Sequence, residues 1–454
     1  MSPLAAGAIA ALTLLAAPVT AQPFQECEDS SAFPALHGSL CAVAQTPLMP
    51  TAAADGESVA LFMRKFPPAD SGRRRGEIWF VAGGPGESGA SFYPALAVLR
   101  RAFPDYDLVM PDHRGTGYSS KLCEKEEAPD SPGGVALAGE EWGPCIAAMH
   151  TNIRRTHAFT ITNAAHDLST LIGRYRGEGE VYLYGVSYGT QLVLRMLQVA
   201  PIGLDGVILD GLVPPESASQ WDLSHRTRIV DAVGRTLLSR VQTSDYRRLL
   251  AQEQAWQKAL PGGDLRQFMG SLLSFPALRG RISDIVESLS RGDAALLART
   301  DADLEAQVAL LNSYPQSPPS LPLVALISGS ENNGRRDLTA ETVAEEAREA
   351  LFSSPVPGLL VDSSISLYER DRYFGQTPRR LPRTLVIHGT LDPNTAYEGA
   401  REHAAVLAPA GDIRFTTVSG GAHFLALMAP DCFVQAASAF VARAVTPDRC
   451  DLPH

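Results

Sequence analysis

A serine stands between two glycines in the pattern Gly-x-Ser-x-Gly, which residues 185–189 form around Ser187. A short apolar run at 181–184 leads into the pattern, and a segment with helical spacing follows it. At a sharp turn from a strand into a helix, small neighbours let the serine hydroxyl rise above the sheet at the helix N-terminus. The pattern alone is common by chance, and a purely structural turn is the alternative. Its setting predicts Ser187 as a nucleophile.

A serine hydroxyl is a weak nucleophile, so it needs a base and an acid that orients the base. After such a turn the chain order is serine, acid, histidine. Asp392 and His423 each come shortly after a late strand-like run, whereas Asp210 follows an earlier run and is the main alternative for the acid. Other histidines lack this setting, among them His113, His388 and His403. The sequence therefore predicts a catalytic triad of Ser187, Asp392 and His423.

The negative charge that develops during acyl transfer needs two backbone N–H groups. One should come from Tyr188, directly after the nucleophile, and the other from the loop after an early strand. The glycine-rich loop at 83–86 is that loop, and Gly84 is the expected donor. A glycine-rich loop on its own would indicate only a turn. Together with the serine turn after another strand, it indicates an oxyanion hole.

The elements that must position these residues are visible as short apolar runs, mostly closed by glycine, at 77–82, 107–111, 181–184, 206–210, 384–388 and 413–418. Segments with helical spacing alternate with them at 158–175, 190–199 and 425–445. Buried strands that alternate with helices predict an α/β protein with a mainly parallel sheet.

Between the fourth and fifth of these runs the strand pattern nearly vanishes. Residues 215–380 have mainly helical spacing and predict a helical cap inserted into the core, which then comprises 22–214 and 381–454. Within the cap, residues 312–336 are rich in Ser, Pro, Gly and Asn and predict a loop.

Composition excludes one large class of function. The 454 residues include 50 acidic and 39 basic side chains, which gives a formal net charge of −11. No general basic surface for nucleic acid is therefore expected. No Cys/His spacing of a zinc site occurs, so neither a metal nor a cofactor is predicted.

The first 21 residues are apolar and uncharged, with small residues before position 22. They predict a cleaved signal peptide and a secreted or periplasmic protein, and an uncleaved anchor is the alternative. No later stretch is long and apolar enough to span a membrane.

All six cysteines follow this leader, which suits an oxidising compartment. Six cysteines allow 15 pairings. The sequential pairing closes short local loops and is the one we favour over six reduced thiols: Cys27 with Cys41, Cys123 with Cys145, and Cys432 with Cys450.

At its motifs the sequence resembles the proline iminopeptidase and tripeptidyl aminopeptidase family of α/β-hydrolases. The matching stretches are GGPGESG (83–89), DHRGTGYS (112–119), GVSYGT (185–190), LDGLVPP (209–215), HGTLDPNT (388–395) and GGAHF (420–424). The N-terminal and C-terminal cysteine pairs also look like the secreted tripeptidyl aminopeptidase branch. The cap matches poorly.

The resemblance implies the α/β-hydrolase fold and a serine exopeptidase that acts on peptides with a free N-terminus. Such an enzyme needs a carboxylate for the substrate ammonium. Glu369 matches the acid of a family stretch at the end of the cap, although Leu367 replaces the usual cysteine. Glu87 stands where the family has a small residue, so it is a second candidate for substrate binding.

Two other functions remain open at this stage. An esterase or lipase would use the same triad without an amine anchor. A non-catalytic binding protein could also keep the scaffold. The peptide length removed, the residue preferred at the cut and the oligomeric state do not follow from the sequence.

Overall fold

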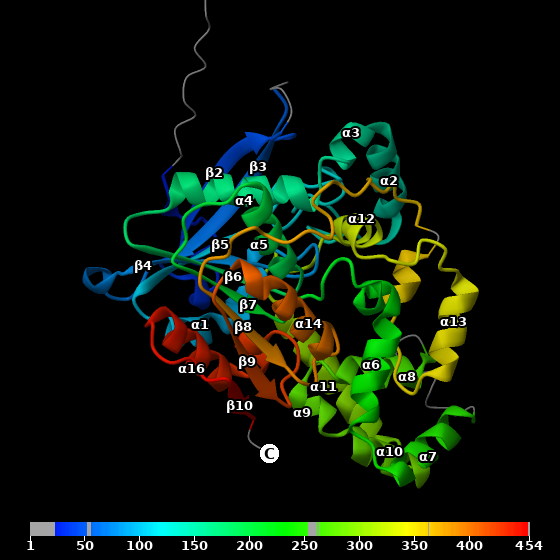
Figure 1. Cartoon of the computed structure of the whole chain (residues 1–454). Helices are drawn as coiled ribbons and strands as arrows, with labels where there is room; N and C mark the ends of the chain where they lie inside the picture. The colour runs from blue at the N-terminus through cyan, green and yellow to red at the C-terminus, as the bar shows by residue number, and fades with distance from the viewer. Residues whose placement is uncertain (1–22, 52–55, 253–259, 261–262, 362, 453–454) are drawn as a thin grey trace, which may run out of the picture.

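A computed structural model describes residues 23–51, 56–252, 260, 263–361 and 363–452 (Figure 1). The predicted signal peptide, residues 1–21, lies outside the described residues. Within them, one sheet has ten strands in the order β1-β2-β3-β5-β4-β6-β7-β8-β9-β10. Their bounds are β1 Gln25–Glu26, β2 Leu40–Pro47, β3 Ser58–Phe66, β4 Gly76–Val81, β5 Tyr106–Pro111, β6 Glu180–Val186, β7 Gly206–Asp210, β8 Thr384–Gly389, β9 Ile413–Ser419 and β10 Arg449–Asp451.

The sheet is mainly parallel, as the sequence predicts. Strands β1, β2 and β3 pair antiparallel, and β3 is also antiparallel to β5. Every later neighbour pair, from β5 and β4 to β9 and β10, is parallel. Strands β4, β5, β7 and β8 are buried at every position, which is typical of parallel strands covered on both faces.

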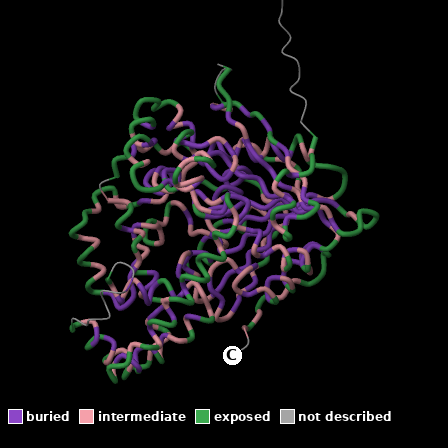
Figure 2. Tube along the Cα trace, turned by 180° about the vertical axis from the view of Figure 1, so that it is seen from behind, coloured by how far each residue is buried: buried purple, intermediate pink, exposed green. Residues whose placement is uncertain are grey.

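Helices cover both faces of the sheet. They are α1 Leu96–Ala102, α4 Ile161–Tyr175, α5 Tyr188–Val199, α14 Tyr397–Leu407, α15 Leu425–Met428 and α16 Pro430–Val441, while α2 Trp142–Thr151 and α3 Ile153–Thr156 lie beside the sheet (Figure 1). Successive strand residues point to opposite faces. Trp79 accordingly joins the apolar cluster under α4 and α5, and Phe80 joins the cluster under α1 and α16. Figure 2 shows the buried residues gathered along the sheet.

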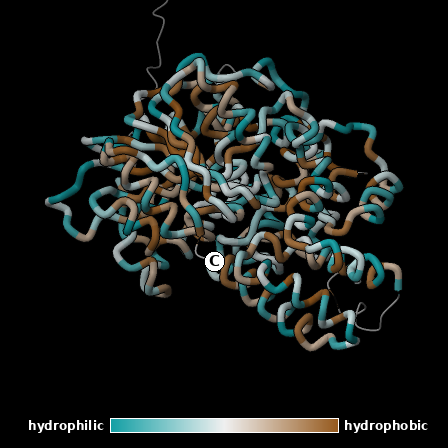
Figure 3. Tube along the Cα trace, turned by 60° about the horizontal axis from the view of Figure 1, so that its bottom comes forward, coloured by the Kyte–Doolittle hydropathy of each residue, from teal (hydrophilic) through white to brown (hydrophobic). Residues whose placement is uncertain are grey.

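A second helical block occupies the interval between β7 and β8. Its helices are α6 Arg226–Arg235, α7 Arg240–Leu250, α8 Leu265–Leu272, α9 Pro276–Arg279, α10 Ile282–Ser290, α11 Ala295–Leu311, α12 Leu321–Glu331 and α13 Ala340–Glu349. Much of this block has its own apolar cluster, which includes Tyr246, Phe268, Ile285 and Phe352. Hydrophobic residues accordingly gather both around the sheet and within this block (Figure 3).

Helix α12 corrects the loop predicted at 312–336. The hydroxyl of Ser320 accepts a hydrogen bond from the Leu323 N–H at 3.4 Å and caps the helix, and Pro322 lies in the first turn, where it needs no N–H. The small residues that indicated a loop are buried in the helix. Leu323 and Leu326 belong to the apolar cluster of the sheet and not to that of the cap. The small residues of this segment therefore allow the helix to pack closely on the core.

The six cysteines form three disulfides, Cys27–Cys41, Cys123–Cys145 and Cys432–Cys450. They are the local pairs expected from the sequence. Within the described part of the chain, none of the helices combines the length and the apolar character that crossing a membrane requires.

Candidate active site

Ser187 lies at the turn between β6 and α5. Its backbone has φ 55° and ψ −127°, a conformation that non-glycine residues rarely adopt. Its N–H donates to the backbone oxygen of Asp210 at 2.9 Å, so the turn is anchored to the end of the neighbouring strand β7. Strain of this kind persists only where the surroundings impose it, and here it places the serine at the carboxyl edge of the sheet.

Asp392 and His423 form a direct pair, with 2.7 Å between Oδ2 and Nδ1. Asp392 is buried and also accepts hydrogen bonds from the Asn394 N–H at 2.7 Å, the Thr395 N–H at 2.8 Å and the Thr395 hydroxyl at 2.8 Å. Burial would raise the pKa of this carboxyl, but the charge and hydrogen bond of His423 outweigh it and hold the pKa below its usual value.

The same pair acts on the imidazole. Burial would lower the pKa of His423, yet the charge and hydrogen bond of Asp392 raise it, with a smaller contribution from Asp210. An ionised Asp392 accepts a hydrogen bond from the Nδ1–H of His423. In the neutral ring the other nitrogen, Nε2, then carries the lone pair.

Asp210, the alternative acid, has a different set of partners. Its Oδ2 accepts hydrogen bonds from the Tyr184 hydroxyl at 2.6 Å and the Ala426 N–H at 3.1 Å, and its Oδ1 accepts one from the Leu425 N–H at 3.0 Å. These amides begin helix α15, two residues after His423. Asp210 thus holds the loop that carries the histidine, while Asp392 contacts the ring.

The loop after β4 approaches Ser187 closely. A Cβ on Gly83 would lie 3.1 Å from the Ser187 Cβ and 3.3 Å from the Glu87 Oε2, so a side chain at this position would crowd the serine. Gly84 has φ +108° and lines a cavity together with Ser187 and Tyr188. Tyr188 is the first residue of α5, and its N–H has no partner within the helix. Both expected oxyanion donors therefore belong to residues at the serine.

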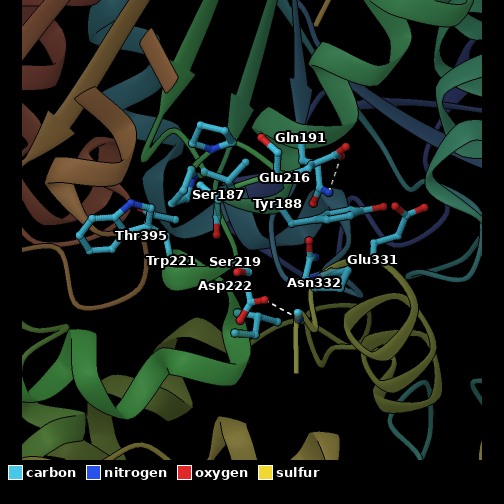
Figure 4. A pocket seen from close by; sticks show the side chains of 18 of the residues that line it. Ser187, Tyr188, Gln191, Glu216, Ser219, Trp221, Asp222, Glu331, Asn332 and Thr395 are labelled. Atoms are coloured by element: carbon cyan, nitrogen blue, oxygen red, sulfur yellow. Dashed lines mark hydrogen bonds between the residues drawn. The ribbon is translucent and has the colours of Figure 1, made fainter. Parts of the chain in front are cut away.

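The cavity has a volume of about 220 Å³ and is lined by the core and by the cap (Figure 4). From the core comes the serine turn, and from its boundary with the predicted cap comes the Pro214-Pro215 segment. From the cap and the chain that follows it come Trp221, Arg226, Glu331 and Phe374. In Figure 4, Ser187 lies between Thr395 and Trp221 on one side and Tyr188 and Glu331 on the other.

One wall of the cavity is acidic. Glu216 accepts hydrogen bonds from Gln191 at 2.8 Å and from Arg195 at 2.8 Å and 3.1 Å. The same Arg195 lies 3.7 Å from Glu331 and 3.6 Å from Asp371. Arg370 also lines the cavity, where it donates to the backbone oxygens of Ser330, Glu331 and Asn333 and its charge acts on Glu331. Three carboxylates therefore face two guanidinium groups, and the wall carries an excess of negative charge when all are ionised.

Glu331, at the end of α12, is the least compensated of these groups. It is 3% exposed, its Oε1 accepts a hydrogen bond from Tyr368 at 3.2 Å, and its Oε2 has no hydrogen-bond partner in the described part of the chain. Burial raises the pKa of Glu331 to about 7, Arg195 offsets part of this rise, and the nearby carboxylates Glu216 and Asp371 add to it.

The sequence analysis did not identify this wall. Glu216 directly follows the LDGLVPP stretch, which was a usable signal, but Glu331 lay in the interval predicted as a loop. Glu369, the predicted amine anchor, is exposed and lies outside the cavity. The reason is local, because the preceding Tyr368 takes the buried position and donates to Glu331.

Glu87, the second predicted substrate-binding residue, lies close to the serine and not at the acidic wall. It is partly buried, and burial raises the pKa of its carboxyl, with His423 offsetting part of the rise. The structure thus separates the two predicted acids, with Glu87 near the triad and Glu369 at the surface.

Comparisons with known proteins follow this geometry. Residues 78–270 match the family model described as the alpha/beta hydrolase fold, and residues 366–451 match the one described as TAP-like protein. No curated protein matches the chain in sequence.

Solved structures with a similar fold have low sequence identity. A thermophilic esterase from Thermogutta terrifontis has 14% identity and a TM-score of 0.37, with 88% of this chain and 98% of that chain covered. An epoxide hydrolase from an endophytic Streptomyces has 14% identity and a TM-score of 0.42, with 92% and 100% covered. The Aspergillus niger epoxide hydrolase has 13% identity and a TM-score of 0.37, with 91% and 80% covered.

The assignment rests on the strand order, on the turn at Ser187 and on the family matches, which agree with one another. The chain thus has the α/β-hydrolase fold, and residues 366–451 are similar to the TAP-like family model.

Proposed function

We propose that the protein is a secreted serine aminopeptidase, which releases residues or short peptides from free N-termini through an acyl-enzyme on Ser187. The observation that carries this proposal is the acidic wall in the same cavity as the serine. A buried carboxylate without enough positive charge around it favours a cationic ligand, and a peptide N-terminus is such a cation.

The triad performs the chemistry in two steps. His423 takes the proton of Ser187 as the hydroxyl attacks the scissile carbonyl, and Asp392 stabilises the imidazolium that forms. The backbone N–H groups of Gly84 and Tyr188 stabilise the oxyanion. His423 then protonates the leaving amine, and water hydrolyses the acyl-enzyme by the same route.

The acidic wall positions the substrate. Glu216 is already bound by Gln191 and Arg195, so Glu331 is the group whose Oε2 has Arg195 at 3.7 Å but no hydrogen bond among the described residues. The buried Tyr188 hydroxyl also lacks a partner among the described residues, which provides a second acceptor nearby. A substrate ammonium at this wall would lie on the Tyr188 side of the serine, and its distance from Ser187 would set how many residues are released.

Two further observations support the proposal. The match of 366–451 to the TAP-like model favours a peptidase over an esterase. The three disulfides are compatible with a secreted protein, as is the predicted leader.

The deciding experiment compares one peptide with a free N-terminus and the same peptide with an acetylated N-terminus. The proposal predicts that acetylation lowers kcat/KM by at least about tenfold, because a charge-assisted hydrogen bond to Glu331 is lost. Equal rates would favour an esterase or a peptidase without an amine anchor. Absence of labelling by a fluorophosphonate, with Ser187→Ala as the control, would favour a binding protein.

A further inference from the structure

The opposite side of the cavity carries a positive charge that the proposed chemistry does not use. Arg226, the first residue of α6, brings its guanidinium from the cap into the cavity. Its Nη1 donates to the Asn394 side-chain oxygen at 2.7 Å. Its Nε is buried and has no hydrogen-bond partner among the described residues. The hydrogen bond that is formed therefore goes to a neutral amide.

This environment differs from that of the most buried arginines, which face carboxylates at short distance: Arg64 with Asp29 at 2.6 Å, Arg114 with Asp167 at 2.6 Å and Arg195 with Glu216 at 2.8 Å. Among the described residues, Arg100, Arg279 and Arg370 are partly buried without an ion pair as well, but each of them donates to backbone oxygens. No ion pair is formed by Arg226 in the described part of the chain. A desolvated cation without a paired anion is costly. Burial accordingly lowers the pKa of Arg226 to about 10, and Asp392 offsets only part of this shift.

The position of Arg226 relative to the triad identifies which part of a substrate it would meet. Its partner Asn394 belongs to the Asp392 loop, and its charge acts on both Asp392 and His423. The histidine must reach the leaving amine to protonate it, so the leaving group lies on the His423 side of Ser187. The acidic wall lies on the Tyr188 side. Arg226 is therefore placed on the leaving-group side.

We propose that Arg226 binds a carboxylate on the first residue of the leaving peptide, which is either an acidic side chain or the C-terminal carboxylate of a short substrate. This inference rests on the proposed aminopeptidase function. A guanidinium presents several N–H donors in one plane and suits a carboxylate better than any neutral group. The cavity would then recognise both charges that flank the scissile bond, an ammonium at Glu331 and a carboxylate at Arg226.

The test compares substrates within one enzyme preparation. A neutral peptide with a free N-terminus first defines the cleavage site. Glu or Gln, each in a peptide amide, is then placed directly after that site. A second pair ends at that residue with a neutral side chain, either as the free acid or as the amide. Because each result is a ratio of kcat/KM values, it does not depend on the amount of folded protein.

For the wild-type protein we expect the carboxylate member of at least one pair to be favoured by about tenfold or more. The first pair reports a side-chain carboxylate and the second reports a C-terminal one. Arg226→Gln should reduce the ratio to about one while it still cleaves the neutral peptide, and Arg226→Lys should keep part of the preference. Arg235→Gln removes the same charge from the far end of α6 and should leave the ratio unchanged.

Ratios near one in the wild type would overturn the inference, as would a preference that persists in Arg226→Gln. Either result leaves the proposed function intact, because cleavage of the neutral peptide tests it separately. If the wild type cleaves esters but no peptide, the proposed function fails. The role of Arg226 is then tested with the acetyl esters of lactate and lactamide, whose leaving groups differ only in a carboxylate or an amide. The ratio of their kcat/KM values takes the place of the peptide ratio.

Discussion

Replacing Glu331 by Gln should make the protein more stable at alkaline pH and less able to bind substrate. The folded-state pKa of Glu331 is about 7, against an ordinary value of 4.5. A carboxyl with a raised pKa favours folding fully below the lower value, and this contribution is lost as the pH rises through the upper one. The difference corresponds to about 3 kcal/mol in the free energy of unfolding above pH 7.

The Glu331→Gln variant should therefore exceed the wild type in stability by about 3 kcal/mol at pH 8 and by less than about 1 kcal/mol at pH 5. For a chain of 454 residues, the unfolding entropy is roughly 1 kcal/mol per degree, so Tm should rise by about 3 °C at pH 8. Glutamine keeps the size of the side chain and its contact with Tyr368, which limits the change to the charge.

Thermal unfolding at the two pH values, with disulfides intact, measures the first effect. Peptide hydrolysis at pH 8 measures the second, and KM for a free N-terminus should rise by about tenfold or more. Glu369→Gln is the matched control, because that carboxylate is exposed and outside the cavity. It should change neither quantity. An equal change in Tm at pH 5 and pH 8 would refute the reasoning that ionised Glu331 is poorly compensated.

Three predictions concern the triad. Ser187→Ala should lower kcat by several orders of magnitude, measured against active-site-labelled wild type, and near-normal turnover would rule out the serine as nucleophile. Asp392→Asn should lower kcat by about 10⁴-fold, since the amide would favour the wrong imidazole tautomer; a loss below tenfold would contradict that role. The base must be neutral, and the pKa of His423 is raised above 6.5, so kcat/KM for an ester without an amine should fall as pH drops through a midpoint above 6.5. A midpoint below 6 would contradict the pairing with Asp392.

The six strands β4 to β9 could be predicted from the sequence as short apolar runs, and four of them are buried at every position. Strands β1, β2, β3 and β10 were not predicted, because β1, β2 and β10 are partly exposed and form no continuous apolar run. The run at 181–184 lies within β6, and the run at 384–388 lies within β8. Chain order and strand ends were also enough to select Asp392 and His423, which the structure brings into contact. Asp210 shows the limit of this reasoning, because it also follows a strand and could have been the acid of the triad. Only its hydrogen bonds in the structure show that it holds the loop after His423.

The acidic wall was beyond prediction for a physical reason. Sequence periodicity reports local structure, whereas the charge balance around Arg195 depends on residues from four separate segments. Glu331 was missed because the small residues of α12 resemble a loop unless the surface on which they pack is known. Glu369 was chosen by its match to a family stretch, and the neighbouring Tyr368 took the inward position.

Helix α12 has a consequence for exchanging caps between related proteins. Ser320, which caps the helix, donates its N–H to the Gly86 oxygen at 3.0 Å, and the Ser88 hydroxyl donates to the Gln316 oxygen at 2.5 Å, so this segment holds the loop that carries Gly84. Its other end carries Glu331. A chimaera that takes the cap from a relative should therefore retain the native segment from Gln316 to Glu331. This segment lies within the cap in sequence, but it packs on the core and holds a core loop.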